Sequence, residues 1–473
     1  MKDLPEFEGF WWSPDDPDTQ LAGRLISDDG VAKLILTIDS PGHFPFSRSE
    51  SREYEVLHGR TSDGKQITLL KCFDLNTSWS SSGIEKRIVL ANYVLVGGLV
   101  PQSKVENAFS ELSLKWPGLQ RWFFESGVSV EHDDGDFRSF TIRYKAKETF
   151  GFEYLKGLKI EFGFSTDKIP FGGPLTEQIE FNEIVWVTLK KDTPKSLEYY
   201  IEKLNELIQF FSICVLEYNQ PQVVTLVGDF DIETREDGTS ISPHLQVYYS
   251  SVQEPQSDRR PHPIEILMPY GVIKENFQQI LKSWAKVAAE VSPSRSLYFS
   301  SLYGTNKYIE STFLSLAQSA EVFHRRRYGG TYIPDEKYRE DVLPALESAI
   351  PHELDSDVKQ AYKQRLEYFN EFSLAKRLKM MSSNHKDVFS MFVPDWKSKI
   401  RSIVKARNYY THYSEGGGNV APDINKLVEY REFLKMLIEL EMLTATGVNI
   451  ELLHSQAKRC QRYRWNFPVN HAK

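Results

Sequence analysis

Three side chains with complementary chemistry lie near the end of one predicted helix. The segment Ile400–Tyr413 is typical of the last turns of a helix, which the glycines Gly416–Gly418 would end. Within it, Asn408 and His412 are four residues apart and share a helical face, and Arg407 is long enough to reach the same point. A guanidinium orients a phosphate, an amide holds an oxygen, and an imidazole moves a proton between a ribose 2′-hydroxyl and a leaving oxygen. The set therefore predicts catalysis on an RNA phosphodiester.

The spacing of Arg407 and His412 resembles the motif of the HEPN ribonucleases, in which an arginine and a polar residue precede a histidine. Two other arginine–histidine pairs of similar spacing serve as internal controls, Arg52 with His58 and Arg464 with His471. The first pair falls in an alternating, strand-like segment and the second runs through a proline, so neither can be presented from one helix. The alternative interpretation is that Arg407 and His412 are ordinary residues of a solvated helix face.

Composition restricts how this chain can meet RNA. Its 473 residues carry a formal net charge of −8, so contact with nucleic acid must be local. From Lys376 to Arg407 there are nine basic and two acidic residues, which gives 9 − 2 = +7. Such a run is more often a solvated face than a binding site, but this one leads into the motif. Lys405 and Arg401 are therefore candidates for RNA binding.

Other site classes and compartments have little support in the sequence. The three cysteines, Cys72, Cys214 and Cys460, are far apart, which argues against a disulfide framework and a cysteine-rich zinc site and favours a cytoplasmic protein. There is no signal peptide and no apolar run long enough to span a membrane, so we expect no membrane contact. The motif segment lacks clustered carboxylates and the chain lacks phosphate-binding glycine loops, so we expect neither a metal nor a cofactor.

The first half of the chain is predicted to be β-rich. Leu21–Ile26 and Val31–Ile38 flank an Asp-Asp-Gly turn, and Tyr54–Gly59 and Gln66–Phe73 flank a Ser-Asp-Gly turn, which indicates two hairpins. We expect an antiparallel sandwich or open barrel, followed by a helix that opens at Pro194. The aromatic residues of this first half are expected to pack in the core rather than to form a stacking platform. They include Trp11, Trp12, Trp79, Trp116, Trp122, Phe123 and Phe124.

The second half is predicted to be helical. Gln253–Pro263 is rich in proline and charge and is the best linker candidate. Beyond it, helix-length patterns run over Ile273–Val291, Lys307–Tyr328, Tyr338–Ile350, Asp355–Met381, Val393–Tyr413 and Asp423–Thr444. The fold class is therefore α+β: a β-rich N-terminal domain over residues 1–255, a linker region at 256–272, a helical bundle over 273–460 and a tail at 461–473.

Three further candidates come from the helix that ends near Tyr328. HEPN proteins resemble one another in having such a helix with an acidic residue near the motif arginine, so Glu321 is a candidate to orient Arg407. An exposed helix carboxylate with no such role is an equally good interpretation. Arg325 and Arg326 are candidates for contact with the RNA backbone, or else belong to a solvated helix end.

The opening segment Gly9–Pro14, followed by Gly23-Arg24-Leu25, resembles the start of the β-rich domain of Apea-like HEPN defence proteins of bacteria. This resemblance implies a metal-independent endoribonuclease that acts on host RNA or RNA of tRNA type in anti-phage defence by abortive infection. It also implies a homodimer through the helical domain and a phage-derived trigger. Because the β-rich half carries no recognisable catalytic set and is joined through a polar linker, we expect it to sense the trigger and restrain the nuclease, or else to deliver RNA. The competing hypothesis is a non-catalytic interaction or nucleotide-binding module.

Overall fold

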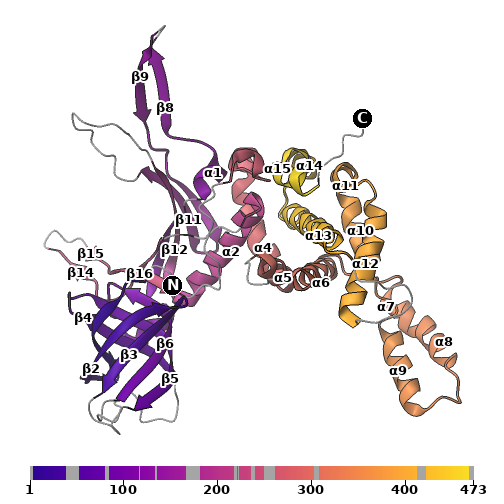
Figure 1. The fold of residues 1–473 in the computed structure, drawn as a ribbon, viewed down its shortest axis with the longest axis horizontal. Coiled ribbons are helices and arrows are strands. Elements are labelled where there is room, and N and C mark those ends of the chain that lie inside the picture. Colours follow the sequence, from indigo (N-terminus) through magenta and orange to yellow (C-terminus); the bar gives the residue numbers. More distant parts are fainter. Residues whose placement is uncertain are drawn as a thin grey trace. The chain divides into compact units, whose positions relative to one another are not determined.

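The computed structural model describes residues 4–38, 53–79, 85–116, 118–133, 136–166, 182–217, 221, 223–235, 240–249, 261–302, 308–412 and 422–467. The chain divides into two compact units, residues 1–211 with 219–261 and residues 212–218 with 262–473. The first unit is β-rich and the second is helical (Figure 1), which confirms the predicted α+β class. Among the described helices, none has the length and apolar character that a membrane crossing requires.

One antiparallel sheet dominates the first unit. The strands are β1 (Phe7–Ser13), β2 (Asp16–Asp28), β3 (Val31–Ile38), β4 (Glu53–Thr61), β5 (Gln66–Trp79), β6 (Glu85–Val96), β7 (Phe109–Lys115), β8 (Val128–Asp133), β9 (Asp136–Tyr144), β10 (Phe150–Leu155), β11 (Leu158–Thr166), β12 (Glu183–Lys195), β13 (Val223–Gly228), β14 (Glu233–Thr234), β15 (Ser240–Ile241) and β16 (His244–Tyr249). Twelve of them form the sheet in the order β10-β11-β12-β7-β13-β16-β6-β3-β2-β1-β4-β5. The pairs β8–β9 and β14–β15 are separate two-stranded ribbons.

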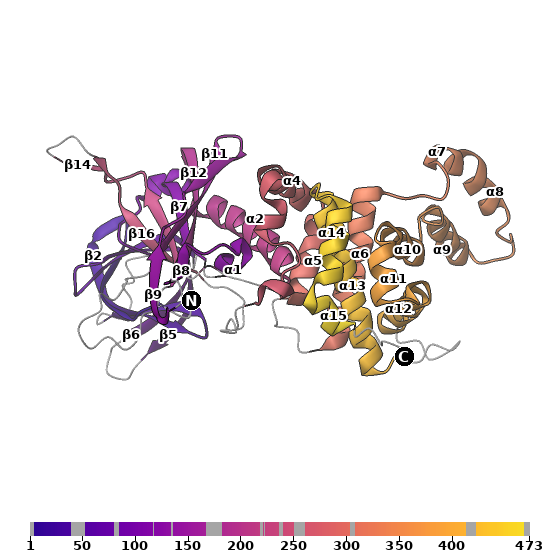
Figure 2. The same cartoon turned by 90° about the horizontal axis from the view of Figure 1, so that it is seen from above.

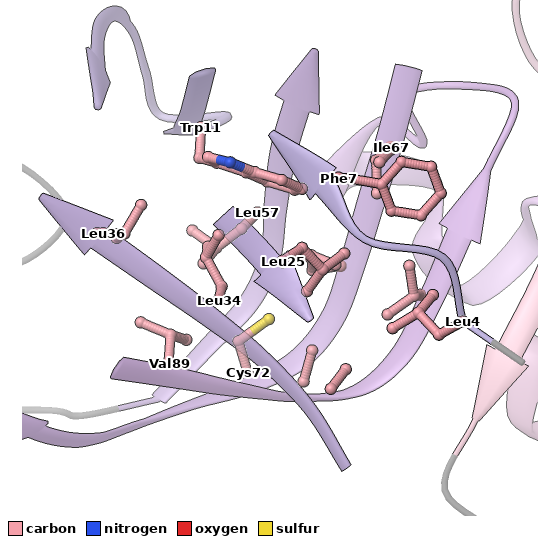
Figure 3. Packing of buried hydrophobic residues seen from close by; sticks show 14 of the residues in the cluster. Leu4, Phe7, Trp11, Leu25, Leu34, Leu36, Leu57, Ile67, Cys72 and Val89 are labelled. Carbon is pink, nitrogen blue, oxygen red and sulfur yellow. The ribbon is translucent and has the colours of Figure 1, made fainter. Parts of the chain in front are cut away.

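Six strands of this sheet close into a barrel because β6 pairs with both β3 and β5. Strands of 12 and 14 residues, β6 and β5, are long enough to bend and serve two partners. Alternate residues of β3 point inward, and Leu34 and Leu36 pack with Trp11 in a closed apolar core (Figure 3). The barrel is thus closed, where the sequence suggested a sandwich or an open barrel.

The predicted turns explain how neighbouring barrel strands are joined. Asp29 and Gly30 connect β2 to β3 with φ values of 48° and 76°. A two-residue hairpin turn with positive φ at both positions matches the twist of the strands, and Gly30 adopts it without steric strain. The expected hairpin between β4 and β5 is also present, with Arg60 opposite Gln66.

An aromatic core joins the remaining strands to helix α2 (Leu197–Val215) and the short helix α1 (Leu119–Phe123). Trp116 and Trp122 each lie about edge-on to Phe211 of α2, with ring centroids 5.1 and 4.9 Å away. Core packing is confirmed for Trp11, Trp12, Trp116, Trp122 and Phe123, whereas Phe124 is 65% exposed and the side chain of Trp79 lies outside the described set. Pro194 does not open α2, because β12 continues through Lys195 before the helix begins.

The second unit is built from helices. They are η2 (Pro263–Glu265), α3 (Tyr270–Ile273), η3 (Lys274–Asn276), α4 (Phe277–Glu290), α5 (Ser292–Leu302), α6 (Ile309–Tyr328), α7 (Asp335–Lys337), the π-helix η4 (Tyr338–Val342), α8 (Leu343–Ser348), α9 (Ser356–Glu367), α10 (Leu374–Asn384), α11 (Lys386–Phe392), α12 (Trp396–His412), α13 (Ile424–Ala445), α14 (Ile450–Arg459) and α15 (Gln461–Asn466). A further 3₁₀ turn, η1 (Gln102–Asn107), belongs to the first unit. Of the predicted linker, residues 253–260 lie outside the described residues.

The predicted helix Asp355–Met381 is two helices, α9 and α10. Ser373 ends the break between them by accepting a hydrogen bond from the backbone N–H of Lys376, as an N-cap does. Within the break, Glu371 forms a β-bridge with Thr331, which closes residues 331–373 into one segment. We call this segment the insert. Its helices α7, α8 and α9 group together at one end of the helical unit (Figure 2).

Candidate active site

Helix α12 presents one apolar and one polar face. Trp396, Ile400, Ile403 and Ala406 are buried, and α12 packs against α6 and α10. Arg401, Lys405, Asn408 and His412 are all exposed. Their spacing of four, three and four residues places them along one stripe of the helix. The two motif residues Asn408 and His412 therefore continue a stripe that begins with two basic side chains.

Arg407 lies beside this stripe and is held in place by two acceptors. Its Nη2 donates to Oε2 of Glu321 at 3.3 Å, and its Nη1 donates to Oδ1 of Asn408 at 3.2 Å. The Arg407 side chain is 35% exposed and that of Glu321 is 17% exposed. A guanidinium has more N–H donors than these two bonds use. Arg407 is therefore oriented by protein groups and still reaches solvent.

The carboxylate of Glu321 is shared. Its Oε1 accepts from Nη2 of Arg325 at 3.2 Å, one turn further along α6. Arg325 also contacts Glu371 of the insert. Three consecutive ion pairs thus connect Arg407 on α12 to Glu371, through Glu321 and Arg325.

A buried arginine anchors the far end of this chain of ion pairs. Arg377 is 1% exposed and lies 3.9 Å from Glu371. It donates to the backbone carbonyls of Phe372 at 2.9 Å and Gly329 at 2.7 Å, and to Nδ1 of His324 at 3.0 Å. Burial, and then the charge of Arg377, lower the pKa of His324, which keeps its ring neutral and able to accept this bond. These bonds hold both ends of the insert against the end of α6.

The basic candidates separate into paired and unpaired groups. Arg325 is committed to Glu321 and Glu371, whereas Arg326 is exposed and forms no ion pair with any described residue. Arg401 and Lys405 are likewise exposed and unpaired within the described chain. In the basic run before the motif, Arg377 is buried and Lys399 pairs with Glu429 at 2.7 Å, so the run is not one continuous patch.

His412 is the last residue of α12 and is exposed, with no hydrogen-bond partner among the described residues. Its imidazole is therefore accessible for proton exchange with a bound molecule. The predicted glycine stop, Gly416–Gly418, lies outside the described residues. In the described part of the chain, no group of three histidine, cysteine, aspartate or glutamate side chains is placed to hold a metal ion.

Sequence reasoning missed one member of this site, Glu371. The patterns around it suggested the middle of a long helix, where a glutamate attracts no attention. The signal that was available is Asn370-Glu371-Phe372-Ser373, in which asparagine and serine are frequent at helix ends. A break at that point would have placed Glu371 in a connection able to approach α6.

Comparison with known families divides the chain in a similar way. Residues 6–284 match the family described as ApeA N-terminal domain 1, and residues 314–452 match the family described as Apea-like HEPN. The second match contains Glu321, Arg407, Asn408 and His412. Neither a curated protein nor a solved structure matches the chain.

Proposed function

Because the chain belongs to the Apea-like HEPN family with an ApeA-type N-terminal domain, we propose that it is an endoribonuclease whose site is formed by Arg407, Asn408 and His412. HEPN domains are generally nucleases, which supports an RNA-directed activity. The observation that carries the proposal is the geometry of Arg407. Its guanidinium is oriented by Glu321 and Asn408 on an exposed helix face that also carries His412.

The chemistry follows from these side chains. Arg407 neutralises the phosphate and stabilises charge that develops on its oxygens in the transition state. The 2′-hydroxyl loses its proton, its oxygen attacks phosphorus, and the bond from phosphorus to the 5′-oxygen breaks. The 5′-oxygen takes up a proton, so the products are a 2′,3′-cyclic phosphate and a 5′-hydroxyl. The nucleophile is part of the substrate, so the reaction requires no metal-bound water.

A second copy of the chain would complete this site. The reaction needs one group to accept a proton and another to donate one, and the exposed end of α12 offers a single histidine, His412. A homodimer that brings two α12 helices together would supply both groups, together with two arginines. Arg401, Lys405 and Arg326 are available to contact the RNA backbone.

For the biological role we propose anti-phage defence by abortive infection, with host RNA or RNA of tRNA type as substrate and a phage-derived trigger. The first unit supports a sensing role through the ribbon β8–β9. Val130, Phe140 and Ile142 are 53%, 56% and 36% exposed, and Val130 lies opposite Ile142. Exposed apolar residues on a two-stranded ribbon are typical of a surface that a partner covers.

The test is RNA cleavage by the purified full-length protein and its His412→Ala variant. His412 is exposed, so its removal leaves the fold intact. We expect cleavage to be lost in this variant and retained in His352→Ala, which removes another exposed histidine from the same unit. Cleavage should persist in EDTA, yield cyclic phosphate ends, and fail on an all-deoxy strand, which lacks the 2′-hydroxyl.

Full activity of a folded His412→Ala protein would refute the assignment of this residue. A strict requirement for Mg²⁺ or cutting of the all-deoxy strand would refute the mechanism. Binding of RNA or nucleotides without any cleavage by the unmodified protein would instead favour a non-catalytic binding module.

A further inference from the structure

The insert forms an open pocket of about 530 Å³. The two ends of the insert are joined by two backbone hydrogen bonds. Tyr332 N–H donates to the Asn370 carbonyl at 2.9 Å, and Phe372 N–H donates to the Gly330 carbonyl at 3.1 Å. Side chains from both ends and from η4 line it, including Tyr332, Ile333, Val342, Phe369 and Glu371. The volume lies within the range of about 300–1,000 Å³ that is usual for small-molecule sites. We call it the insert pocket.

Two aromatic residues of the pocket are open to solvent. Tyr332 is 56% exposed and Phe369 is 67% exposed. Large apolar rings at such exposure are available to stack on a planar partner.

Few hydrogen-bonding groups in the pocket remain unused. Oδ1 of Asn370 accepts from Ile333 N–H at 3.1 Å, and Nδ2 of Asn370 donates to the Ile333 carbonyl at 2.9 Å and to Asp335 at 3.0 Å. The pocket therefore offers flat apolar contact rather than a pattern of donors and acceptors. Such a surface binds a ring by its face and is tolerant of the ring's identity.

Charges of both signs lie around the pocket. The carboxylate of Glu371 is part of its wall and that of Asp335 bonds Asn370, while one cation, Lys376, lies beside its aromatic residues. The ammonium group of Lys376 lies 5.5 Å from the ring centroid of Phe372, which itself packs against Tyr332 with centroids 5.0 Å apart. The pKa of the Tyr332 hydroxyl is lowered, first by its hydrogen bond with Ser373 and then by Lys376 and Arg377. Apolar rings beside the Lys376 ammonium suit a molecule that carries both an aromatic ring and an anionic phosphate.

The pocket is also close to the candidate active site. Glu371 forms part of its wall and is linked through Arg325 and Glu321 to Arg407. Glu321 and Arg325 are one helical turn apart, or about 6 Å along α6. The wall of the pocket and Arg407 are thus separated by three successive ion-pair contacts within the same helical unit.

We propose that the insert pocket receives an unstacked nucleobase of the RNA whose phosphodiester lies at Arg407, a subsite that rests on the ribonuclease function proposed above. The base stacks on Phe369 and Tyr332, and its neighbouring phosphates lie near Lys376. Because the contact is made to the face of the base, the pocket selects unpaired over paired RNA more strongly than it selects one base over another.

The decisive experiment uses the full-length chain and short single-stranded RNAs that carry one 2-aminopurine, moved along the strand. Binding is measured in the His412→Ala background so that the RNA stays intact. At one label position the fluorescence should be quenched by stacking. Adding Phe369→Ala should abolish that quenching and weaken binding about 5- to 100-fold. Tyr368→Ala is the matched control, since Tyr368 is also 67% exposed but does not line the pocket.

Cleavage kinetics give an independent readout in the otherwise unmodified protein. Phe369→Ala should raise KM for single-stranded RNA by a similar factor and leave kcat within about twofold, because stacking binds substrate and transition state alike. Equal quenching and KM in the Phe369→Ala and Tyr368→Ala proteins would overturn the proposal while leaving the ribonuclease function standing. Quenching that depends on Phe369, in a protein that cleaves no RNA, would support the base-binding pocket and refute the proposed ribonuclease function.

Free mononucleotides distinguish the source of the base. An oligonucleotide should bind more tightly than any single mononucleotide, because its phosphates also contact Arg401 and Lys405. A mononucleotide that displaces the label as tightly as the oligonucleotide would make the pocket a site for a free nucleotide and would overturn its role as a substrate subsite.

Discussion

Glu321→Gln is the substitution that most directly tests how Arg407 is positioned. The change preserves the size of the side chain and removes the charge to which Arg407 and Arg325 are both bonded. Arg325 keeps its second partner, Glu371, so the insert stays attached to α6. The substitution therefore acts mainly on the orientation of Arg407.

The expected magnitude follows from the exposure of the pair. A charge-assisted hydrogen bond shielded from water contributes about 1.5–3 kcal/mol, and an exposed ion pair about 0–1 kcal/mol. Arg407 is 35% exposed and Glu321 is 17% exposed, and the separation is 3.3 Å, so solvent screens a large part of the interaction. We therefore take about 1 kcal/mol as the contribution of this ion pair to holding Arg407 in its orientation. This corresponds to roughly a fivefold change in the fraction of oriented Arg407.

Steady-state cleavage of RNA by the full-length variant is the assay. We expect kcat to fall about fivefold, KM to stay constant or decrease because a negative charge has been removed beside the phosphate, and stability to change by less than about 1 kcal/mol. Glu290→Gln is the matched control. It breaks an ion pair with Arg327 of 2.8 Å, in which both side chains are 36% exposed, without touching Arg407.

Three results would contradict this reasoning. An unchanged kcat would mean that Arg407 is oriented without Glu321. A higher kcat would mean that Glu321 restrains Arg407 and competes with the phosphate for its donors. A decrease in kcat equal to that of the Glu290→Gln protein would indicate that removing any surface negative charge has this effect.

Three further outcomes are expected. Arg377→Ala should lower the free energy of unfolding by about 2–5 kcal/mol, as measured by denaturant titration, because it empties the space of a buried side chain and removes its hydrogen bonds to the carbonyls of Phe372 and Gly329; a loss below about 1 kcal/mol would contradict this. Mixing inactive Arg407→Ala with inactive His412→Ala protomers under subunit exchange should restore cleavage if one cleft takes its arginine and histidine from different chains, and an active monomer on light scattering would exclude that arrangement. Replacing Phe140 and Ile142 by serine should abolish the response of cells to phage while leaving cleavage by the purified protein unchanged, and an unaltered response would remove the ribbon β8–β9 from sensing.

Local patterns in the sequence were sufficient for some of the elements, among them α12 with its polar face and the hairpin between β2 and β3. Apolar spacing predicted the helix that carries Arg407, Asn408 and His412, because burial of one face follows from a period of 3.6 residues. The Asp29-Gly30 turn was predictable from its own residues, because aspartate and glycine adopt the positive φ values with which a two-residue turn joins adjacent strands. Each of these features depends on residues close together in the chain.

The tertiary structure alone decided the features that depend on distant residues. Glu321 and Arg407 are 86 positions apart, and their contact exists only because α6 and α12 pack together. The burial of Arg377, which sequence counting assigned to a basic surface, depends on carbonyls of residues 329 and 372 that the fold brings around it. The break before α10 and the insert pocket arise from the pairing of residues 330–332 with 370–372. Periodicity records which face of an element is buried, but not which other element covers it.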